Sequence, residues 1–387
     1  MSSVERIQIK EEILHWVIQE SQKESEEVIN KFPKVVGWIK GDIKPTFKQL
    51  QDFASFLKVP FGYLFLKEPP KINIMEAEFR TINNKLPSMS KNLKDTITSM
   101  DIRRIWMSDY RRDLGWGKLT IIREFNDRKN GLIKEDVNLA KSLLKLEENW
   151  YGKVKDYGEA YNFLKTKLEA QGILVMQNGV VGYNTRRVLD IKEFRAFMLY
   201  DDIAPIIFIN NNDSLGGKIF SLIHEFFHVL HEQEDLFLED DIYSTKKNER
   251  YINRLTGEFL MPENYIKEKW DENSDPFAQI QSMAKHFKVS ETALAIKLKE
   301  LALIEEDTLN NIIDIAIKYF DKKTNEPGES GGDFYNTFNT RISPTFTKAV
   351  IRSTEAGDIE YTYAFRLLGG IRGKTYDEIK RRILPYG

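Results

Sequence analysis

The residues best suited to chemistry lie in one short segment, SLIHEFFHVLHEQ, which contains His224-Glu225-x-x-His228. Residues four apart on a helix lie on one face about one turn apart, so both imidazoles can reach the same small cation. Glu225 is rotated by about 100° from His224, so its carboxylate can hold a water beside the cation without binding the cation. Because the chain has only 5 histidines, chance rarely produces this spacing. The alternative is two ordinary histidines on a half-buried helix.

A catalytic zinc usually has three protein ligands and one open position. An unbroken helix separates His231 from His224 by about 10 Å along its axis, so one ion cannot bind both. His231 is therefore predicted either to support the transition state from beside the metal or to be a surface histidine. Glu249, at the start of ERYINRLTGEFLMP, is the predicted third ligand, although an acid at a helix start can simply stabilise the helix dipole. Glu258 is expected to face solvent.

These groups together predict hydrolysis of a peptide bond. Zinc lowers the pKa of bound water to about 7 and polarises a carbonyl, and Mn, Fe or Co would accept the same ligands. Glu225 would take the proton of the water and pass it to the leaving amine. The strand PIIFIN directly precedes the metal helix. An exposed edge there would hold an extended substrate by main-chain pairing.

Composition excludes several other classes of protein. The 387 residues include no Cys, which excludes disulfide scaffolds, thiol nucleophiles and Cys-ligated metals. The 57 basic and 59 acidic side chains give a formal net charge of −2, so only a local patch could bind nucleic acid. No signal peptide is apparent, and the apolar runs are far shorter than the ~20 residues that span a bilayer. We expect a cytoplasmic protein with no membrane partner.

The elements that must position this chemistry are mostly helical, with a few strands after residue 150. Strands are predicted at ILVM, FRAFMLY and PIIFIN, and helices at about 217–231 and 247–261. Ser290 is a predicted N-cap between two further helices, and Thr46 a predicted helix start. Trp106, Tyr110, Leu114 and Trp116 are expected to be apolar anchors of a helical region over 90–150. Linkers are predicted at 67–72 and 325–333.

Three segments closely resemble the ImmA/IrrE metallo-endopeptidases: FRAFMLYDDIAPIIFIN, IFSLIHEFFHVLH and ERYINRLTGEFLMP. The resemblance covers about residues 155–305. It implies that His224, His228 and Glu249 bind the metal and that Glu225 is the general base. The segment around Asn253 departs from the usual family pattern, which has Ala before this Asn and Phe-Ala after it.

Residues 10–66 resemble the helix-turn-helix domain of the XRE (Cro/CI-like) type found in long family members, and Phe79-Arg80-Thr81 matches the segment after it. The tail from about residue 334 resembles their C-terminal extension. DNA binding through this first domain is one interpretation, since Lys34, Lys40, Lys44 and Lys48 could contact phosphates. However, PKVVGWIKG offers few side chains for base edges, so a protein-docking or dimerising domain is the alternative. MAKHFKVSETALAIKLKEL is similarly helical, and there a helical cap on the peptidase is favoured over a nucleic-acid contact.

The predicted fold is α+β and mostly helical, with a zincin-like domain built on a small sheet. The four predicted parts are an XRE-like domain at 1–70, a helical linker region at 71–150, the metallopeptidase domain at 151–305 and a helical extension at 306–387. The predicted function is a zinc endopeptidase. The family resemblance implies that it cleaves a helix-turn-helix repressor and so releases gene expression in a stress, mobile-element or toxin–antitoxin-like setting. The alternatives are a DNA-binding or antitoxin-like regulator whose metal site is a sensor or scaffold, and a toxin activated by a ligand. The helical domain could recruit the repressor, its DNA or a second copy of the chain.

Overall fold

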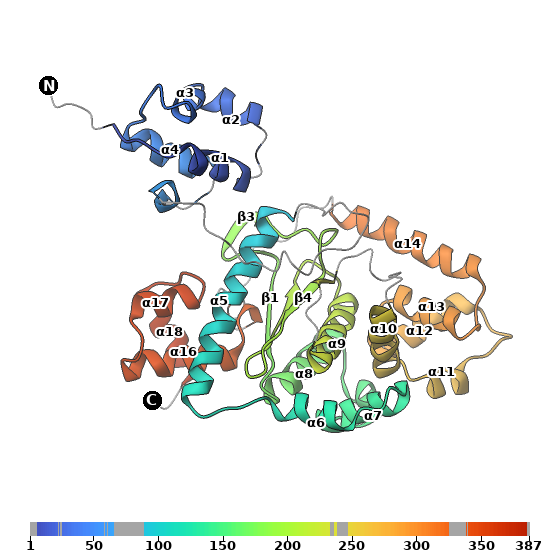
Figure 1. Cartoon of the computed structure of the whole chain (residues 1–387). Helices are drawn as coiled ribbons and strands as arrows, with labels where there is room; N and C mark the ends of the chain where they lie inside the picture. Colours follow the sequence, from blue (N-terminus) through green and yellow to red (C-terminus); the bar gives the residue numbers. More distant parts are fainter. Residues whose placement is uncertain are drawn as a thin grey trace. The chain divides into compact units, whose positions relative to one another are not determined.

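The computed structural model describes residues 6–21, 23, 25–57, 59, 61–65, 89–232, 236–237, 247–324, 338 and 340–384 (Figure 1). The chain divides into two compact units, Met1–Thr98 and Ser99–Gly387. The predicted linkers at 67–72 and 325–333, and Phe79-Arg80-Thr81, lie outside the described residues. No helix within the described ranges is long and apolar enough to cross a membrane.

The first unit is a small helical bundle with a core of its own. Its elements are α1 (Glu11–Glu20), α2 (Ser25–Lys31), α3 (Val35–Ile39), α4 (Phe47–Leu57) and the 3-10 helix η1 (Phe61–Phe65). Trp38 and Phe53 meet edge to face in that core, with ring centroids 5.5 Å apart. Thr46 begins α4 as predicted. Its hydroxyl accepts from the Gln49 N–H at 3.3 Å, and the Gln49 side chain accepts from the Thr46 N–H at 2.9 Å, which forms a reciprocal cap.

The second unit is built on a four-stranded sheet in the order β1-β5-β4-β6. The strands are β1 (Leu174–Asn178), β5 (Ile206–Asn210), β4 (Ala196–Leu199) and β6 (Leu236–Phe237), beside a separate hairpin of β2 (Val180–Val181) and β3 (Asn184–Val188). β1 and β5 are parallel, and β4 is antiparallel to both of its neighbours. The three predicted strands are all present. However, β5 is internal and buried along its whole length, so the expectation of an exposed edge at PIIFIN was wrong.

Helices surround this sheet and carry the residues of interest (Figure 1). They are α5 (Lys91–Asp113), α6 (Thr120–Arg128), α7 (Ile133–Leu143), the 3-10 helix η2 (Trp150–Lys153), α8 (Tyr157–Ala170), α9 (Leu215–His231), α10 (Lys247–Leu260), α11 (Glu263–Lys269), α12 (Pro276–Phe287), α13 (Glu291–Glu300) and α14 (Glu306–Thr324). α9 packs against β5 and β4, α8 packs against β1 and α9, and α10 packs against α9 and α7. The tail is helical as expected, with α16 (Pro344–Ala356), α17 (Tyr361–Leu367) and α18 (Gly373–Ile383).

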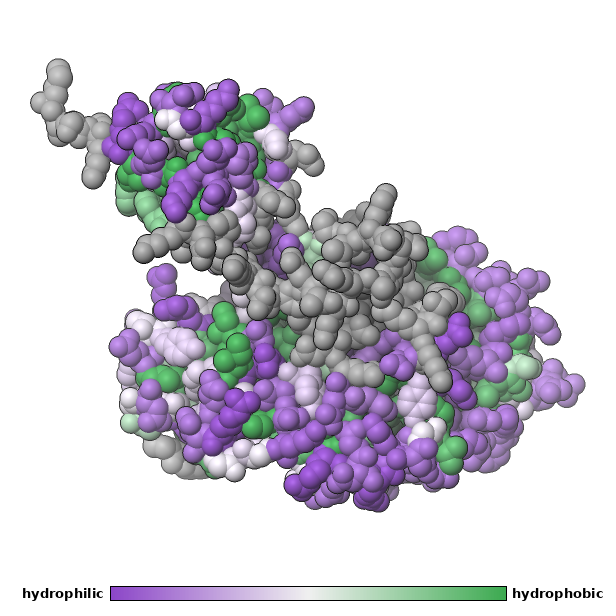
Figure 2. All heavy atoms as spheres, in the orientation of Figure 1, coloured by the Kyte–Doolittle hydropathy of each residue, from purple (hydrophilic) through white to green (hydrophobic). Residues whose placement is uncertain are grey.

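One hydrophobic core extends through the second unit from Leu119 to Ile312, on both sides of residue 150. Trp106 is buried as expected of an anchor. Leu114 and Trp116 are not, since they are 60 % and 47 % exposed. Both follow the end of α5, and the Trp116 ring instead covers the buried Arg111 guanidinium at 4.7 Å. On the face that Figure 2 shows, the described atoms are mostly hydrophilic, with apolar side chains in small scattered groups.

Candidate metal centre

α9 holds two histidines of the motif inside the protein. Ser214 caps the start of this helix by accepting from the Gly217 N–H, and the helix ends at Glu232, which has a left-handed backbone with φ of 60°. Between these ends nearly every side chain is buried, which is typical of a helix covered on all sides. The first turn needs glycine, because a Cβ on Gly216 would lie 2.8 Å from the backbone nitrogen of Ser290. α9 therefore passes directly against the turn between α12 and α13.

His224, His228 and Glu249 converge on one point. The two Nε2 atoms are 3.0 Å apart. Glu249 places one carboxylate oxygen 3.5 Å from Nε2 of His224 and the other 3.2 Å from Nε2 of His228. Ligands at zinc-like distances on the corners of a tetrahedron lie about 3.3 Å apart. The three side chains thus have the donor types and the spacing of one face of a tetrahedral site, so they fit a divalent metal.

Burial sets the ionisation of this group. His224 is fully buried, which lowers its pKa to about 4 despite the opposing effect of Glu249. Burial alone raises the pKa of Glu249, but hydrogen bonds with His224 and His228 outweigh it and hold that pKa well below its usual range. At neutral pH the group therefore contains a neutral imidazole at His224 and a carboxylate at Glu249. These are the forms that bind metals.

α10 places Glu249 through contacts beyond the metal group. The Tyr251 hydroxyl donates to the Asp136 carboxylate at 2.6 Å. Asp136 is buried on α7 and also accepts from the backbone N–H groups of Asn130 and Gly131. The hydrogen bond between Tyr251 and Asp136 therefore joins α10 to α7 at a position two residues after Glu249. Ile252, Leu255 and Phe259 form the buried side of α10, as the sequence pattern predicts.

Glu258 does not face solvent, and that expectation was wrong. Its side chain is only 9 % exposed, and the carboxylate lies 3.1 Å from Nζ of Lys297, which is 10 % exposed. The carboxylate also accepts from the Glu263 N–H. α13 covers the side of α10 that the sequence pattern assigned to water. A buried ion pair with an additional backbone donor satisfies the carboxylate there.

Glu225 and His231 both lie on α9 but in different surroundings. Glu225 is fully buried and directly follows His224. His231 is not one of the three converging groups. Its Nδ1 is 2.9 Å from the Phe227 carbonyl oxygen, and its ring meets Phe125 and Tyr251 edge to face. Burial lowers the pKa of His231, with a smaller opposing effect from the Phe227 carbonyl.

Two contacts of His224 were not predicted from the sequence. The Phe220 ring lies nearly parallel to its imidazole, with centroids 6.3 Å apart. The Asn253 side chain interacts with His224 by a hydrogen bond that raises its pKa against the effect of burial. Both residues are one helical turn from a predicted ligand, Phe220 from His224 and Asn253 from Glu249, so helical spacing was the signal that could have found them.

Comparison with known families supports a peptidase. Residues 168–299 match the family model described as the IrrE N-terminal-like domain, Peptidase_M78. This M78 segment is about a third of the chain and contains His224, Glu225, His228 and Glu249. It supports the resemblance to ImmA/IrrE and a metallopeptidase-type function for this part of the molecule.

Outside the M78 segment, the comparisons give little about function. Residues 342–382, which include α16, α17 and all but the last residue of α18, match a domain of unknown function, DUF8813. No curated protein matches the chain. The helical tail therefore corresponds to a recognised family without an assigned role.

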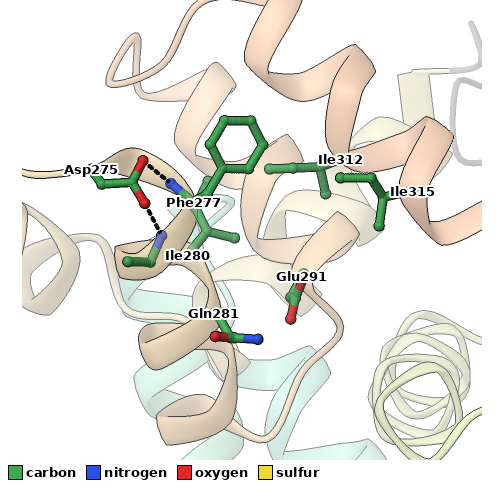
Figure 3. A pocket seen from close by; sticks show the side chains of 8 residues that line it. Asp275, Phe277, Ile280, Gln281, Glu291, Ile312 and Ile315 are labelled. Atoms are coloured by element: carbon green, nitrogen blue, oxygen red, sulfur yellow. Dashed lines mark hydrogen bonds between the residues drawn. The ribbon is translucent and has the colours of Figure 1, made fainter.

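A separate hollow of about 310 Å³ lies among α12, α13 and α14 (Figure 3). Phe277, Ile280, Ile312 and Ile315 form its apolar lining. The Asp275 carboxylate at its rim accepts from the backbone N–H groups of Phe277 and Ala278, and so caps α12. None of the residues that line this hollow belongs to the metal group.

Proposed function

We propose that this protein is a zinc-dependent endopeptidase. The observation that carries the proposal is the buried triangle of His224, His228 and Glu249, with donor atoms 3.0–3.5 Å apart, beside the buried carboxylate of Glu225. Two imidazoles and one carboxylate form a donor set typical of catalytic zinc, which keeps a further position open. The match of residues 168–299 to the M78 model supports the same reaction class.

The chain's own residues have distinct parts in this reaction. A divalent metal held by His224, His228 and Glu249 would acidify a water molecule and polarise the substrate carbonyl. Glu225 would accept the proton from the attacking water and then donate it to the nitrogen of the leaving amine. Its burial beside the ligands keeps bulk water away from this proton transfer. Phe220 and Asn253 would hold the His224 ring in place.

We propose a helix-turn-helix repressor as the substrate class, with the first unit as an XRE-type domain that recruits it. This part of the proposal is supported by the family resemblance and by the compact helical bundle of α1 to α4 around Trp38 and Phe53. Lys34, Lys40, Lys44 and Lys48 remain the residues to change if that bundle binds DNA instead.

The decisive variant is Glu225→Gln, which keeps the shape of the side chain and removes its ability to accept a proton. We expect the variant to fold, to retain one metal per chain by elemental analysis, and to cleave a co-encoded repressor at least 100-fold more slowly. If E225Q cleaved at the wild-type rate, the proposal would be wrong. The regulator alternative would gain support if DNA binding were the one activity that mutation removed, and if changes to the lysines of residues 34–48 removed it.

A further inference from the structure

Glu232, the first residue after α9, shares a partner with a residue that follows β4. Glu232 reverses the chain with its left-handed backbone, and its N–H donates to the carbonyls at the end of α9. Its carboxylate accepts from Nζ of Lys118 at 2.6 Å and from the Asn126 side chain at 3.0 Å. Lys118 also contacts Asp202, just beyond the end of β4, at 3.4 Å. The chain therefore leaves the metal helix beside the end of β4.

From there β6 pairs with the outer side of β4. The pairing is antiparallel, with Ala196 opposite Phe237 and Phe197 opposite Leu236. Glu232 and Asp202 are held close together by their shared partner Lys118. β4 is thus paired on both sides, by β5 and by the chain's own β6.

This outer side of β4 lies next to the metal group. α8 and α10 lie on opposite sides of α9 (Figure 1). The order of α8 and α9 follows the order of the strands, because α8 contacts β1 and α9 contacts β5 and β4. The metal group lies between α9 and α10, so it is on the side of α9 away from α8, the helix that contacts β1 (Figure 1). An extended peptide added to the outer side of β4 would run past the metal group.

We propose that β6 occupies the position of an extended substrate segment, so that the chain's own strand must leave β4 before a peptide can pair there. The inference rests on the proposed peptidase function and adds its regulation. Extended peptides commonly bind by adding a strand to the edge of a sheet, where main-chain hydrogen bonds supply much of the affinity. Here two residues supply that pairing, so a longer peptide strand would offer more main-chain hydrogen bonds and could displace them.

The register allows β6 to be locked in place. Because the chain has no cysteine, Ala196→Cys with Phe237→Cys introduces the only two thiols, on residues that face each other across β4 and β6. We expect oxidation to form a disulfide and to slow cleavage of fluorescent casein by the zinc-loaded full chain at least tenfold. Reduction with a phosphine should restore the rate. The single variants A196C and F237C, treated identically, are the controls and should not respond.

A second measurement does not depend on catalysis. A labelled peptide with the sequence of residues 232–241, EQEDLFLEDD, should bind the reduced double-cysteine protein at least tenfold more tightly than the oxidised protein. In addition, Leu236→Pro with Phe237→Pro removes the N–H groups of β6 and disrupts its pairing with β4. The amide of Ala196, which faces β6, should then exchange hydrogen faster, whereas that of Phe197, which pairs with β5, should not, and casein cleavage should rise at least threefold.

The outcomes separate the two proposals. The strand inference would be wrong if no disulfide formed or if oxidised and reduced proteins bound the peptide equally. Unchanged hydrogen exchange at Ala196 in the double-proline variant would also contradict it. If casein and repressor remained intact in every form while peptide binding followed the thiol state, the peptidase function would fail and the strand inference would stand.

Discussion

The charge states of His224 and Glu249 decide whether the metal group can bind its ion. His224 is kept neutral by burial, and Glu249 is kept ionised by its two histidine neighbours. Both shifts favour the metal-binding forms near neutral pH. Acid therefore removes both metal-binding forms in turn: it protonates His224 first and Glu249 at lower pH.

We predict that the metal-free protein loses stability as pH falls from 6.5 toward 4. The pKa of His224 is about 4 in the folded state and 6.5 in the unfolded state, so the unfolded state binds more protons in this window. That difference makes the protein about 2 kcal/mol less stable at pH 5 than at pH 7.5. Urea unfolding of chelator-treated protein at the two pH values measures it.

The variant His224→Gln should show a smaller pH dependence than the wild type, whereas His15→Gln should show the same dependence. His15 is the matched control because its side chain is 61 % exposed. An identical pH dependence in H224Q and the wild type would contradict the assignment of the effect to His224.

Among single residues, those with a strong chemical signature could be predicted from the sequence. His224 and His228 have a spacing that places both on one face of α9, and Glu249 lies inside the next helix with its side chain turned inward. Glu258 was misplaced because helix periodicity describes a helix with one buried side, whereas α13 buries a second side of α10. The Tyr251–Asp136 contact joins residues 115 positions apart, and no local pattern encodes such a pair.

At the scale of elements, α9 depends on close backbone approach as well as on side chains. Gly216→Ala would place a Cβ 2.8 Å from the Ser290 nitrogen and 3.0 Å from the Val289 carbonyl carbon, which belong to backbone that cannot rotate away. We expect a loss of about 1–3 kcal/mol in the free energy of unfolding. Gly152→Ala is the control, since its Cβ would meet nothing within 4 Å. Equal stability of the two variants in urea would contradict this prediction.

A second prediction concerns the contact between α10 and α13. Lys297→Met leaves the Glu258 carboxylate buried without its 3.1 Å partner and should cost about 3 kcal/mol of stability. Lys299→Met on the same helix removes a partly exposed contact with Glu306 and should cost less than about 1 kcal/mol. Thermal and urea unfolding of both variants give the comparison. A K297M protein as stable as K299M would show that the buried pair contributes nothing.

The positions of helices and strands along the chain were predicted more reliably than which of them pack or pair with one another. The strands, α9, α10, and the caps at Ser290 and Thr46 follow from local periodicity and hydrogen-bonding side chains. The order β1-β5-β4-β6 could not be predicted, because the partner of a strand depends on contacts distant in sequence. For that reason β5 was taken for an edge although it lies between β1 and β4.

At the scale of the whole molecule, the metal group and every contact described around it lie within residues 99–387. The bundle of the first unit has its own core. We predict that a fragment of residues 89–387 binds one zinc per chain, like the full protein, and keeps its main unfolding transition. Elemental analysis and calorimetry test this. A fragment that folded but bound no metal would show that the first unit takes part in the site.

The burial of nearly every side chain of α9 makes the metal-binding residues structural members of the core as well as ligands. A random search for inactive variants along Leu215–His231 would therefore recover mostly proteins that fail to accumulate, since almost any altered side chain there disturbs packing. Abundance must be measured beside activity for each of them. Glu225→Gln is the change on that helix for which the two measurements should diverge, because it preserves volume and removes only a proton acceptor.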